Sequence, residues 1–386
     1  MKNKRFRIGI LATYFDKHWT GGFIYLVNLI NSLHWLDEAE QPHIVLFYNE
    51  RSQDKLGLIN YPHISYEYFP MPDSNFVTYF KSWLQFKNLF VGNIITEHQL
   101  DGLYPLNDFP GKIHNPANRC RIVSWYPDYQ QKFYPDYFSK LNLFFRELRI
   151  KNILNYSTDL VQSSQDTYSH LRQFFKFNSK KIRIHVLPFV SLINDIPHDD
   201  IGFLCDKYKI KQPYFIVSNQ FYKHKNHLVV YQAIHHLQSQ IEDFQVVFTG
   251  KEEDYRNPEY INSLKEFIID KGLTQKIVSL GVIPREHQLG LMKHALAVIQ
   301  PSKFEGWSTV VEDAKSLKKQ ILLSNLPVHV EQMGDLAYYF DSDSSEQLKE
   351  LMYGMLTKAL PPKAVFDNYE ERIRTFAHLF ISIFKH

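Results

Sequence analysis

The stretch IQPSKFEGWSTVVEDAKSLKKQILLSNLPVHVEQ, residues 299–332, decides the fold predicted for this chain. It begins at the end of an apolar run that predicts a buried strand, and residues 301–307 then predict a loop. Ser308 is suited to cap a helix whose apolar positions share one face. Residues 321–323 predict the next buried strand, and residues 325–332 predict a second loop. Strands and helices that alternate in this way predict an α/β domain with a mainly parallel sheet.

The first loop and the helix start combine two kinds of group that suit a phosphorylated, hydroxylated ligand. Backbone N–H groups and the helix dipole at the helix start favour phosphate. Glu305 in the loop can accept hydrogen bonds from sugar hydroxyls, and Asp313 lies eight positions further on, where it can reach a second set of hydroxyls. We therefore predict a nucleotide sugar as the ligand, with its sugar at Glu305 and its ribose at Asp313.

The segment FEGWSTVVEDAK resembles the signature of glycosyltransferase family 4, whose members are retaining enzymes with the GT-B fold. In that signature two acids lie eight positions apart, as Glu305 and Asp313 do. The family usually has Glu at the second position, and Asp is one methylene shorter. The neighbouring Glu312 is turned by about 100° around the helix, so Asp313 is the better match. The resemblance implies that residues between the two acids also bind the donor, namely Gly306, Trp307, Ser308 and Thr309.

Two further segments match the same family in order and spacing. Gly21 and Gly22 follow the first predicted strand and open a helix, and in the family such a pair lets the backbone approach the donor diphosphate. An ordinary tight turn is the alternative for two glycines. In the second half of the chain, the resemblance assigns Lys225 to the diphosphate, whereas Gln220 stands where relatives have an Arg. Loss of that guanidinium removes a bidentate phosphate contact.

The resemblance also indicates where the nucleotide base and the acceptor bind. The stretch whose backbone packs against the base in relatives corresponds here to Gly281, Val282 and Ile283. On the acceptor side, Asp128 corresponds to an aspartate at the reaction centre, where it would accept a hydrogen bond from a hydroxyl. It can equally be an ordinary turn aspartate. Gln131 stands where relatives often have a His, and a neutral amide cannot share a proton with phosphate as His can.

The strand-like and helical runs along the chain predict two doubly wound, Rossmann-like domains that face each other across a cleft. We expect an N-terminal acceptor-binding domain at residues 1–195 and a C-terminal nucleotide-sugar-binding domain at residues 205–366. Residues 190–211 predict a polar connector between them. The tail, residues 367–386, has apolar residues at helical spacing, and we expect it to pack back on the N-terminal domain, as in GT-B enzymes.

Composition excludes several other classes of protein. The 386 residues suffice for two domains, and a formal net charge of only +3 without a recognised motif argues against a nucleic-acid partner. Cys120 and Cys205 lack metal or disulfide spacing, which favours a reducing compartment. The chain has no apolar run long enough to span a membrane and no complete signal peptide. These features predict a cytoplasmic protein.

Two segments, residues 76–90 and 132–154, combine aromatic with basic residues. Such segments can rest on the anionic leaflet of a membrane, which would suit a lipid-linked acceptor. They can equally be amphipathic helices that pack on the core and present a basic face to solvent. The sequence leaves both interpretations open.

The function implied by the resemblance is retaining transfer of a sugar, of hexosyltransferase type, from a nucleotide-diphosphate donor to a glycan or lipid-linked acceptor. No metal and no other cofactor is expected, and bacterial surface-polysaccharide or lipopolysaccharide assembly is the expected setting. A GT-B epimerase or phosphorylase is an alternative, because fold alone does not settle function. Gln220, Gln131 and Asp313 favour another alternative, a non-catalytic nucleotide-sugar-binding protein. The sugar, base, acceptor and linkage stay open.

Overall fold

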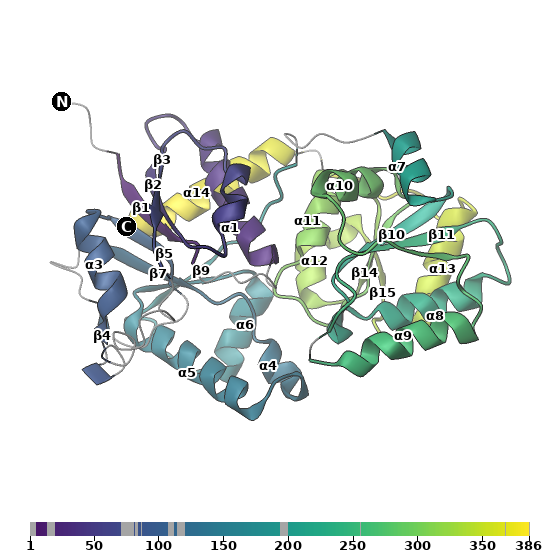
Figure 1. Cartoon of the computed structure of the whole chain (residues 1–386), viewed down its shortest axis with the longest axis horizontal. Helices are drawn as coiled ribbons and strands as arrows, with labels where there is room; N and C mark the ends of the chain where they lie inside the picture. The colour runs from purple at the N-terminus through teal and green to yellow at the C-terminus, as the bar shows by residue number, and fades with distance from the viewer. Residues whose placement is uncertain are drawn as a thin grey trace. The chain divides into compact units, whose positions relative to one another are not determined.

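The computed structural model describes residues 5–13, 20–70, 81, 84–85, 87–106, 112–113, 120–193, 200–254, 256–366 and 368–385. The chain divides into two compact units (Figure 1). Unit 1 comprises Met1–Leu192 and Glu370–His386, and unit 2 comprises Ile193–Tyr369. Each unit has a parallel sheet with helices, so the predicted α/β class is confirmed. The predicted connector, residues 190–211, contains the first helix of unit 2, which the sequence analysis did not anticipate.

The main sheet of unit 1 has the strand order β3-β2-β1-β5-β7-β8-β9, and all of its neighbouring strands are parallel. Since β1 lies between β2 and β5, the strand order reverses direction there, as in a doubly wound fold. A short pair is formed by β4 (Lys87–Asn88) and β6 (Lys112–Ile113). The strands of the main sheet are β1 (Arg7–Leu11), β2 (His43–Tyr48), β3 (Ile64–Tyr68), β5 (Gly102–Leu106), β7 (Arg121–Trp125), β8 (Asp159–Gln162) and β9 (Arg183–Val186).

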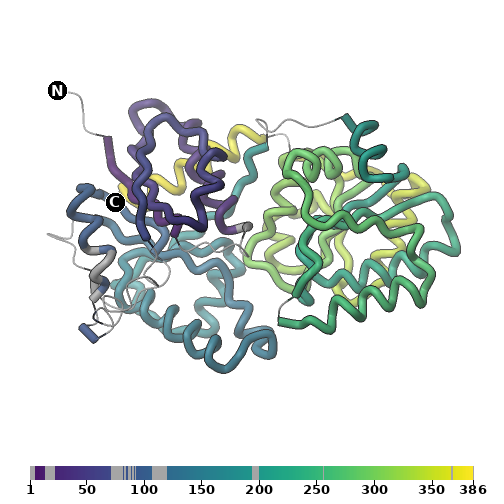
Figure 2. The backbone as a smooth tube through the Cα atoms, viewed as in Figure 1, coloured from purple at the N-terminus to yellow at the C-terminus, as the bar shows by residue number. Residues whose placement is uncertain are grey.

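The last helix of the chain, α14 (Tyr369–Lys385), packs in unit 1, where it is drawn in yellow beside the purple and blue segments (Figure 2). Phe380 stacks edge-on against Tyr104 of β5 at a centroid distance of 5.3 Å. A Cβ added at Gly102 would lie 2.3 Å from the ring of Phe384, so the strand needs glycine where this ring crosses it. The other helices of unit 1 are α1 (Thr20–Ser32), α3 (Leu89–Glu97), α4 (Gln130–Phe133), α5 (Lys140–Tyr156) and α6 (Gln165–Phe174).

The sheet of unit 2 has the order β12-β11-β10-β13-β14-β15, again with all neighbours parallel. Its strands are β10 (Tyr214–Ser218), β11 (Gln245–Thr249), β12 (Ile277–Ser279), β13 (Val298–Gln300), β14 (Ile321–Ser324) and β15 (Tyr338–Phe340). The strand order reverses between β10 and β13. In open α/β sheets, ligands bind outside the carboxyl ends of the strands at such a point.

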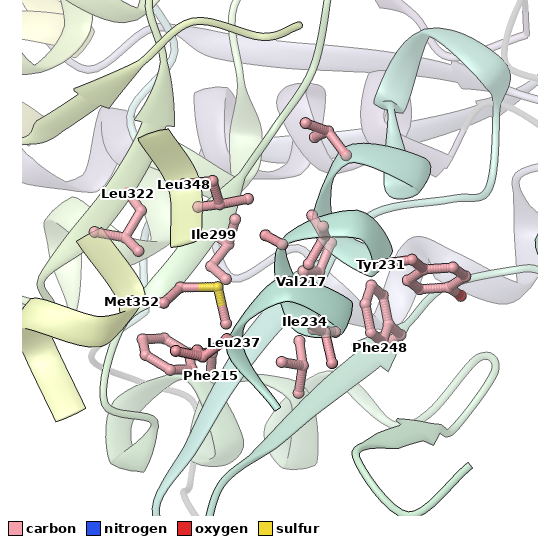
Figure 3. Close-up of a cluster of buried hydrophobic side chains, with 14 of the residues drawn as sticks. Phe215, Val217, Tyr231, Ile234, Leu237, Phe248, Ile299, Leu322, Leu348 and Met352 are labelled. Atoms are coloured by element: carbon pink, nitrogen blue, oxygen red, sulfur yellow. The ribbon is translucent and has the colours of Figure 1, made fainter. Parts of the chain in front are cut away.

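A hydrophobic core packs against the sheet of unit 2 (Figure 3). Phe215 and Val217 from β10 point toward Ile234 of α8 (His227–Leu237) and Met352 of α13 (Ser345–Leu356), because alternate residues of a strand face the same side. The helices of unit 2 are α7 (Ile201–Tyr208), α8 (His227–Leu237), α9 (Pro258–Asp270), α10 (Arg285–His294), α11 (Thr309–Ser316), α12 (Pro327–Met333) and α13 (Ser345–Leu356).

Two local predictions were wrong, and each segment proves to contain a helix. Residues 325–332, predicted as a loop, include most of α12, which begins with Pro327, where the fixed φ of proline suits a helix start. Within residues 190–211, α7 is capped by Asp200, whose carboxylate accepts hydrogen bonds from the N–H groups of Gly202 and Phe203. Both helices are short, and burial of one side against the unit stabilises them more than their sequence pattern does.

None of the helices in the described ranges is long and apolar enough to cross a membrane. Of the two aromatic and basic segments, residues 76–90 lie mostly outside the described ranges, so their predicted role stays a prediction.

Candidate functional site

Lys225 and Glu305 meet at the carboxyl edge of the sheet of unit 2. Lys225 ends the short helical turn Lys223–Lys225 between β10 and α8, and Glu305 lies in the loop after β13. Because β10 and β13 are neighbours, both residues leave the sheet at the point where its strand order reverses. The Nζ of Lys225 donates to Oε1 of Glu305 at 2.6 Å. Their side chains are 18% and 9% exposed, so this is a largely buried ion pair.

Hydrogen bonds to backbone carbonyl groups hold this turn and this loop together. Asn226 follows Lys225 with a φ of 58°, a left-handed conformation that Asn tolerates better than most residues. Its Nδ2 donates to the carbonyl oxygens of Pro301, at 3.1 Å, and of Ser342, at 2.7 Å. The N–H of Lys303 donates to the carbonyl oxygen of His224 at 2.8 Å. The position of Lys225 relative to Glu305 is therefore set by the Asn226 side chain and by a backbone hydrogen bond between the turn and the loop.

Two buried amides that the sequence analysis missed orient the carboxylate of Glu305. Gln300, the last residue of β13, donates through Nε2 to Glu305 Oε1 at 2.8 Å and to Ser308 Oγ at 3.0 Å. Asn219, just after β10, donates through Nδ2 to Gln300 Oε1 at 2.6 Å. The only signal in the sequence was a polar residue at the end of each apolar strand, which is also common in ordinary strand ends.

Glu305 is ionised in this environment. Burial alone would raise the pKa of its carboxyl group, but the charge and hydrogen bond of Lys225 and a hydrogen bond from Ser302 lower the pKa below its ordinary value. Burial lowers the pKa of His329, so this histidine is neutral near pH 7, and its Nδ1 lies 2.9 Å from the carbonyl oxygen of Ser324. A fixed negative charge beside a fixed positive charge suits a ligand with both hydroxyl groups and phosphate.

The start of α11 is capped as predicted. The Oγ of Ser308 accepts from the N–H of Val311 at 3.4 Å. The N–H of Ser308, which was expected to be available for phosphate, instead donates to Oε1 of Gln332 at 3.1 Å. Gln332 also donates through Nε2 to Glu312 Oε1 at 3.2 Å, and Glu312 is buried. Glu312 thus points toward α12, and phosphate at this helix start would have to use the N–H groups after Ser308.

Asp313 lies one turn into α11 and is buried. Its carboxylate accepts two hydrogen bonds from the guanidinium of Arg285, the first residue of α10. Arg285 was not singled out from the sequence, because an arginine at a helix start is unremarkable without knowledge of its partner.

The remaining predicted donor residues of unit 2 also lie at this edge of the sheet. Gln220 lies in the turn after β10, and its backbone carbonyl oxygen accepts a hydrogen bond from the N–H of Tyr222 at 2.8 Å. Gly281 has a φ of 63° and its carbonyl oxygen accepts from the N–H of Gly250 at 2.8 Å. Val282 is 78% exposed, and Gly281 and Ile283 are partly exposed, so a ligand could reach this segment. Gly306 and Trp307 are partly exposed in the loop beside Glu305, and Thr309 begins α11.

The predicted acceptor-side residues lie in unit 1. Gly21 and Gly22 are in the first turn of α1, which follows β1, although residues 14–19 before it are outside the described ranges. Asp128 follows β7 and accepts through Oδ1 from the N–H of Gln130 at 3.0 Å, the contact expected of a turn aspartate. Gln131 is buried and donates through Nε2 to the hydroxyl of Tyr126 at 3.0 Å.

Within the part of the chain that the structure describes, no three His, Cys, Asp or Glu side chains are grouped so that they could hold a metal ion. The expectation of a reaction without a metal or another cofactor stays a prediction.

Comparisons with known proteins agree with this arrangement. Residues 206–372 match the family model described as "Glycosyl transferases group 1". A comparison with curated protein sequences finds no significant match. Among solved structures, Anabaena Alr3699/HepE in complex with UDP and glucose is similar with a TM-score of 0.70 and 15% identity, over 97% of this chain and 98% of that one.

Two other solved structures are similar over nearly the whole chain. A glycosyltransferase from Rickettsia africae ESF-5 has a TM-score of 0.66 and 15% identity, over 98% of this chain and 94% of that one. WaaG, a glycosyltransferase involved in lipopolysaccharide biosynthesis, has a TM-score of 0.63 and 14% identity, over 96% of this chain and 95% of that one. At these identities the structures show a shared fold. The chain therefore has the GT-B fold, and its residues 206–372 match the glycosyl transferases group 1 family.

Proposed function

We propose that this chain is a retaining glycosyltransferase of family 4, which transfers a sugar from a nucleotide-diphosphate donor to an acceptor hydroxyl. The observation that carries the proposal is the buried ion pair of Lys225 and Glu305 where the strand order of unit 2 reverses. The group 1 family match over residues 206–372 supports transferase chemistry, and the similar HepE structure contains UDP and glucose.

In this proposal Glu305 binds the donor sugar and Lys225 binds the diphosphate. The ionised carboxylate accepts hydrogen bonds from sugar hydroxyls, and Gln300 keeps it in place. When the bond between the anomeric carbon and the phosphate oxygen breaks, negative charge grows on the leaving diphosphate. The ammonium of Lys225 is held in place by Glu305 before the donor binds, so little reorganisation is needed as the charge develops. The acceptor oxygen bonds to the anomeric carbon on the face that the phosphate leaves, its proton passes to the leaving phosphate oxygen, and no metal ion takes part.

The acceptor is proposed to be a lipid-linked glycan at the cytoplasmic face of an anionic membrane. Support comes from α5, in which only Ile150 and Ile153 are buried. Leu141, Phe144 and Phe145 are 65%, 61% and 52% exposed and lie at positions i, i+3 and i+4, on one face of the helix. Lysines and arginines of the same helix flank this face. Of the two interpretations left open by the sequence, an exposed aromatic face favours contact with a membrane over packing on the core.

Donor binding and slow donor hydrolysis test the proposed activity. UDP-, GDP-, ADP- and dTDP-sugars are incubated with the wild type, with Glu305→Ala and with Lys225→Ala, and the released nucleoside diphosphate is measured. We expect release from one donor, reduced at least about 100-fold by either substitution. The matched controls are Lys251→Ala and Glu253→Ala, which disrupt an exposed ion pair of unit 2 and should leave release unchanged. Absence of binding to every donor would contradict the proposal.

A non-catalytic nucleotide-sugar-binding protein is the second candidate. It is favoured by Gln220 at a position where relatives have an Arg. It is also favoured by Gln332, whose side-chain oxygen accepts the hydrogen bond from the N–H of Ser308 that a phosphate could otherwise receive. Tight donor binding without hydrolysis or transfer to any acceptor would support this candidate. Appearance of turnover in Gln220→Arg would support it further, because the substitution restores only the missing phosphate contact.

A further inference from the structure

The guanidinium of Arg285 donates hydrogen bonds to both carboxylate oxygens of Asp313. Nη1 donates to Oδ2 at 2.7 Å and Nη2 donates to Oδ1 at 2.5 Å. Two parallel bonds of this kind fix the plane of a carboxylate as well as its position, which a lysine cannot do. The side chain of Asp313 is 3% exposed and that of Arg285 is 30% exposed, so the pair lies at the boundary between the interior and the solvent.

Arg285 is itself held by the carboxyl edge of the sheet. Its Nη1 also donates to Oε1 of Gln288, one turn further along α10, at 3.2 Å. Gln288 donates through Nε2 to Oγ of Ser218 at 2.5 Å, and that hydroxyl is 2.7 Å from the hydroxyl of Thr249. Ser218 and Thr249 are the last residues of β10 and β11. A continuous chain of hydrogen bonds therefore connects Asp313 with the strand ends that border the proposed donor site.

The two hydrogen bonds from Arg285 fix the orientation of the Asp313 carboxylate. The side chain of Asp reaches one methylene less far than that of Glu, so its use to a ligand depends on its orientation. A carboxylate whose plane is fixed can accept hydrogen bonds from two hydroxyls that are fixed at neighbouring carbons. The 2′ and 3′ hydroxyls of ribose form such a pair, and a 2′-deoxyribose does not.

We propose that Arg285 is a positioning residue that orients Asp313 toward the ribose diol, so that this chain selects ribonucleotide donors over 2′-deoxyribonucleotide donors. The inference rests on the proposed function, since it requires a nucleotide at this edge of unit 2. It narrows the donor class to sugars carried on UDP, GDP or ADP and excludes those carried on dTDP. A hydrogen bond from a hydroxyl to an ionised carboxylate is worth about 10- to 100-fold in affinity.

The test compares matched pairs of nucleoside diphosphates that differ only in the 2′ hydroxyl. Calorimetry gives the dissociation constants of UDP and dUDP, GDP and dGDP, and ADP and dADP for the wild type, Arg285→Gln, Arg285→Lys and Asp313→Asn. For the base that binds, we expect the wild type to prefer the ribose form by at least about 10-fold. Arg285→Gln and Asp313→Asn should reduce this preference to less than about threefold, mainly by weakening the binding of the ribonucleoside diphosphate. Arg285→Lys should show a preference between that of the wild type and that of Arg285→Gln, because lysine keeps the positive charge but cannot donate two parallel hydrogen bonds to the carboxylate.

Lys293→Gln is the matched control, because it removes a positive charge from an exposed position of the same helix and should keep the wild-type preference. Thermal unfolding shows whether each variant is folded, and Arg285→Lys carries the test if Arg285→Gln is not. The inference alone is overturned if a nucleotide binds but the wild type does not distinguish ribose from 2′-deoxyribose. It is also overturned if the Arg285 variants keep the full preference for ribose. Binding of dTDP alone would also overturn the inference without contradicting the proposed function. If neither dTDP nor any of the six nucleoside diphosphates binds the wild type, the proposed function and this inference both fail.

Discussion

The Nζ of Lys225 lies 2.6 Å from Oε1 of Glu305, although the two residues are eighty positions apart in the chain. Each residue was recognised from a separate motif, and each was assigned to a different part of the donor. Their contact means that the charges which would bind sugar and phosphate already stabilise each other. The pair is therefore a structural element of unit 2 as well as a candidate binding element.

The ion pair should make its two residues strongly coupled in stability. Lys225→Met leaves the Glu305 carboxylate buried without its partner, and we expect the free energy of unfolding to fall by about 3 kcal/mol. Glu305→Gln in the same background should restore part of this loss, so a double-mutant cycle measured by urea unfolding should give a coupling energy above about 1 kcal/mol. The exposed pair of Lys251 and Glu253 should give less than about 0.5 kcal/mol. Additive effects at Lys225 and Glu305 would show that the pair is not formed.

Gly250 should be intolerant of any side chain. It follows β11 with a φ of 126°, and a Cβ there would lie 2.2 Å from the carbonyl oxygen of Asn219. We expect Gly250→Ala to cost about 3 kcal/mol or more and to weaken nucleotide binding, because Asn219 holds Gln300. Gly272→Ala is the control: its φ is 64° and nothing lies within 4 Å of the added carbon, so only backbone strain of about 1 kcal/mol is expected. Equal unfolding free energies for the two variants would contradict the steric argument.

Asp159 should stabilise unit 1 in a pH-dependent way. Burial alone would raise the pKa of its carboxyl group, but His185, Arg183, Thr158 and Arg121 together lower that pKa to about 2. A lowered folded-state pKa gives stability that is fully present above the unfolded-state pKa of about 4 and is lost as the pH falls toward 2.

We therefore expect Asp159→Asn to reduce the free energy of unfolding by about 3 kcal/mol at pH 7, because it leaves cations beside a neutral buried group. Urea unfolding between pH 7 and pH 2.5 should show this difference shrink below pH 4. The same substitution at the exposed Asp54 should change little at any pH. A difference at Asp159 that does not vary with pH would contradict the ionic explanation.

The exposed face of α5 should govern binding to anionic vesicles. Phe144→Ser with Phe145→Ser removes two aromatic rings from this face, and we expect at least about a 10-fold weaker partition to vesicles of phosphatidylglycerol and phosphatidylcholine in a sedimentation assay. Vesicles of phosphatidylcholine alone should bind the wild type weakly, because the basic residues then have no counter-charge. Phe203→Ser is the control, since Phe203 is 50% exposed on α7 of unit 2. Vesicle binding that is unaffected by the α5 substitutions would place membrane contact elsewhere, and absence of vesicle binding by the wild type would contradict membrane contact.

Much of the fold was predictable because its signals are local. The strand-like runs at residues 43–48, 121–125, 159–162, 214–218 and 245–249 predict buried strands from sequence alone, because short apolar runs lie between turn residues there. The strands β2, β7, β8, β10 and β11 have these bounds. The cap of α11 by Ser308 was predictable for the same reason. The short helices α7 and α12 were not predicted, because their stability depends on burial against the rest of unit 2 rather than on their own pattern.

The sequence by itself determined the α/β class, the parallel sheets and the candidate residues Glu305, Lys225 and Asp313, because strand pattern, helix caps and motif spacing are properties of neighbouring residues. Only the tertiary structure decided which side chains those residues meet: Lys225 for Glu305, Arg285 for Asp313 and Gln332 for Ser308. Such partners come from different strand ends that the sheet order brings side by side. Since hydrogen bonds act over about 3 Å, their choice depends on the folded geometry and leaves no regular spacing in the sequence.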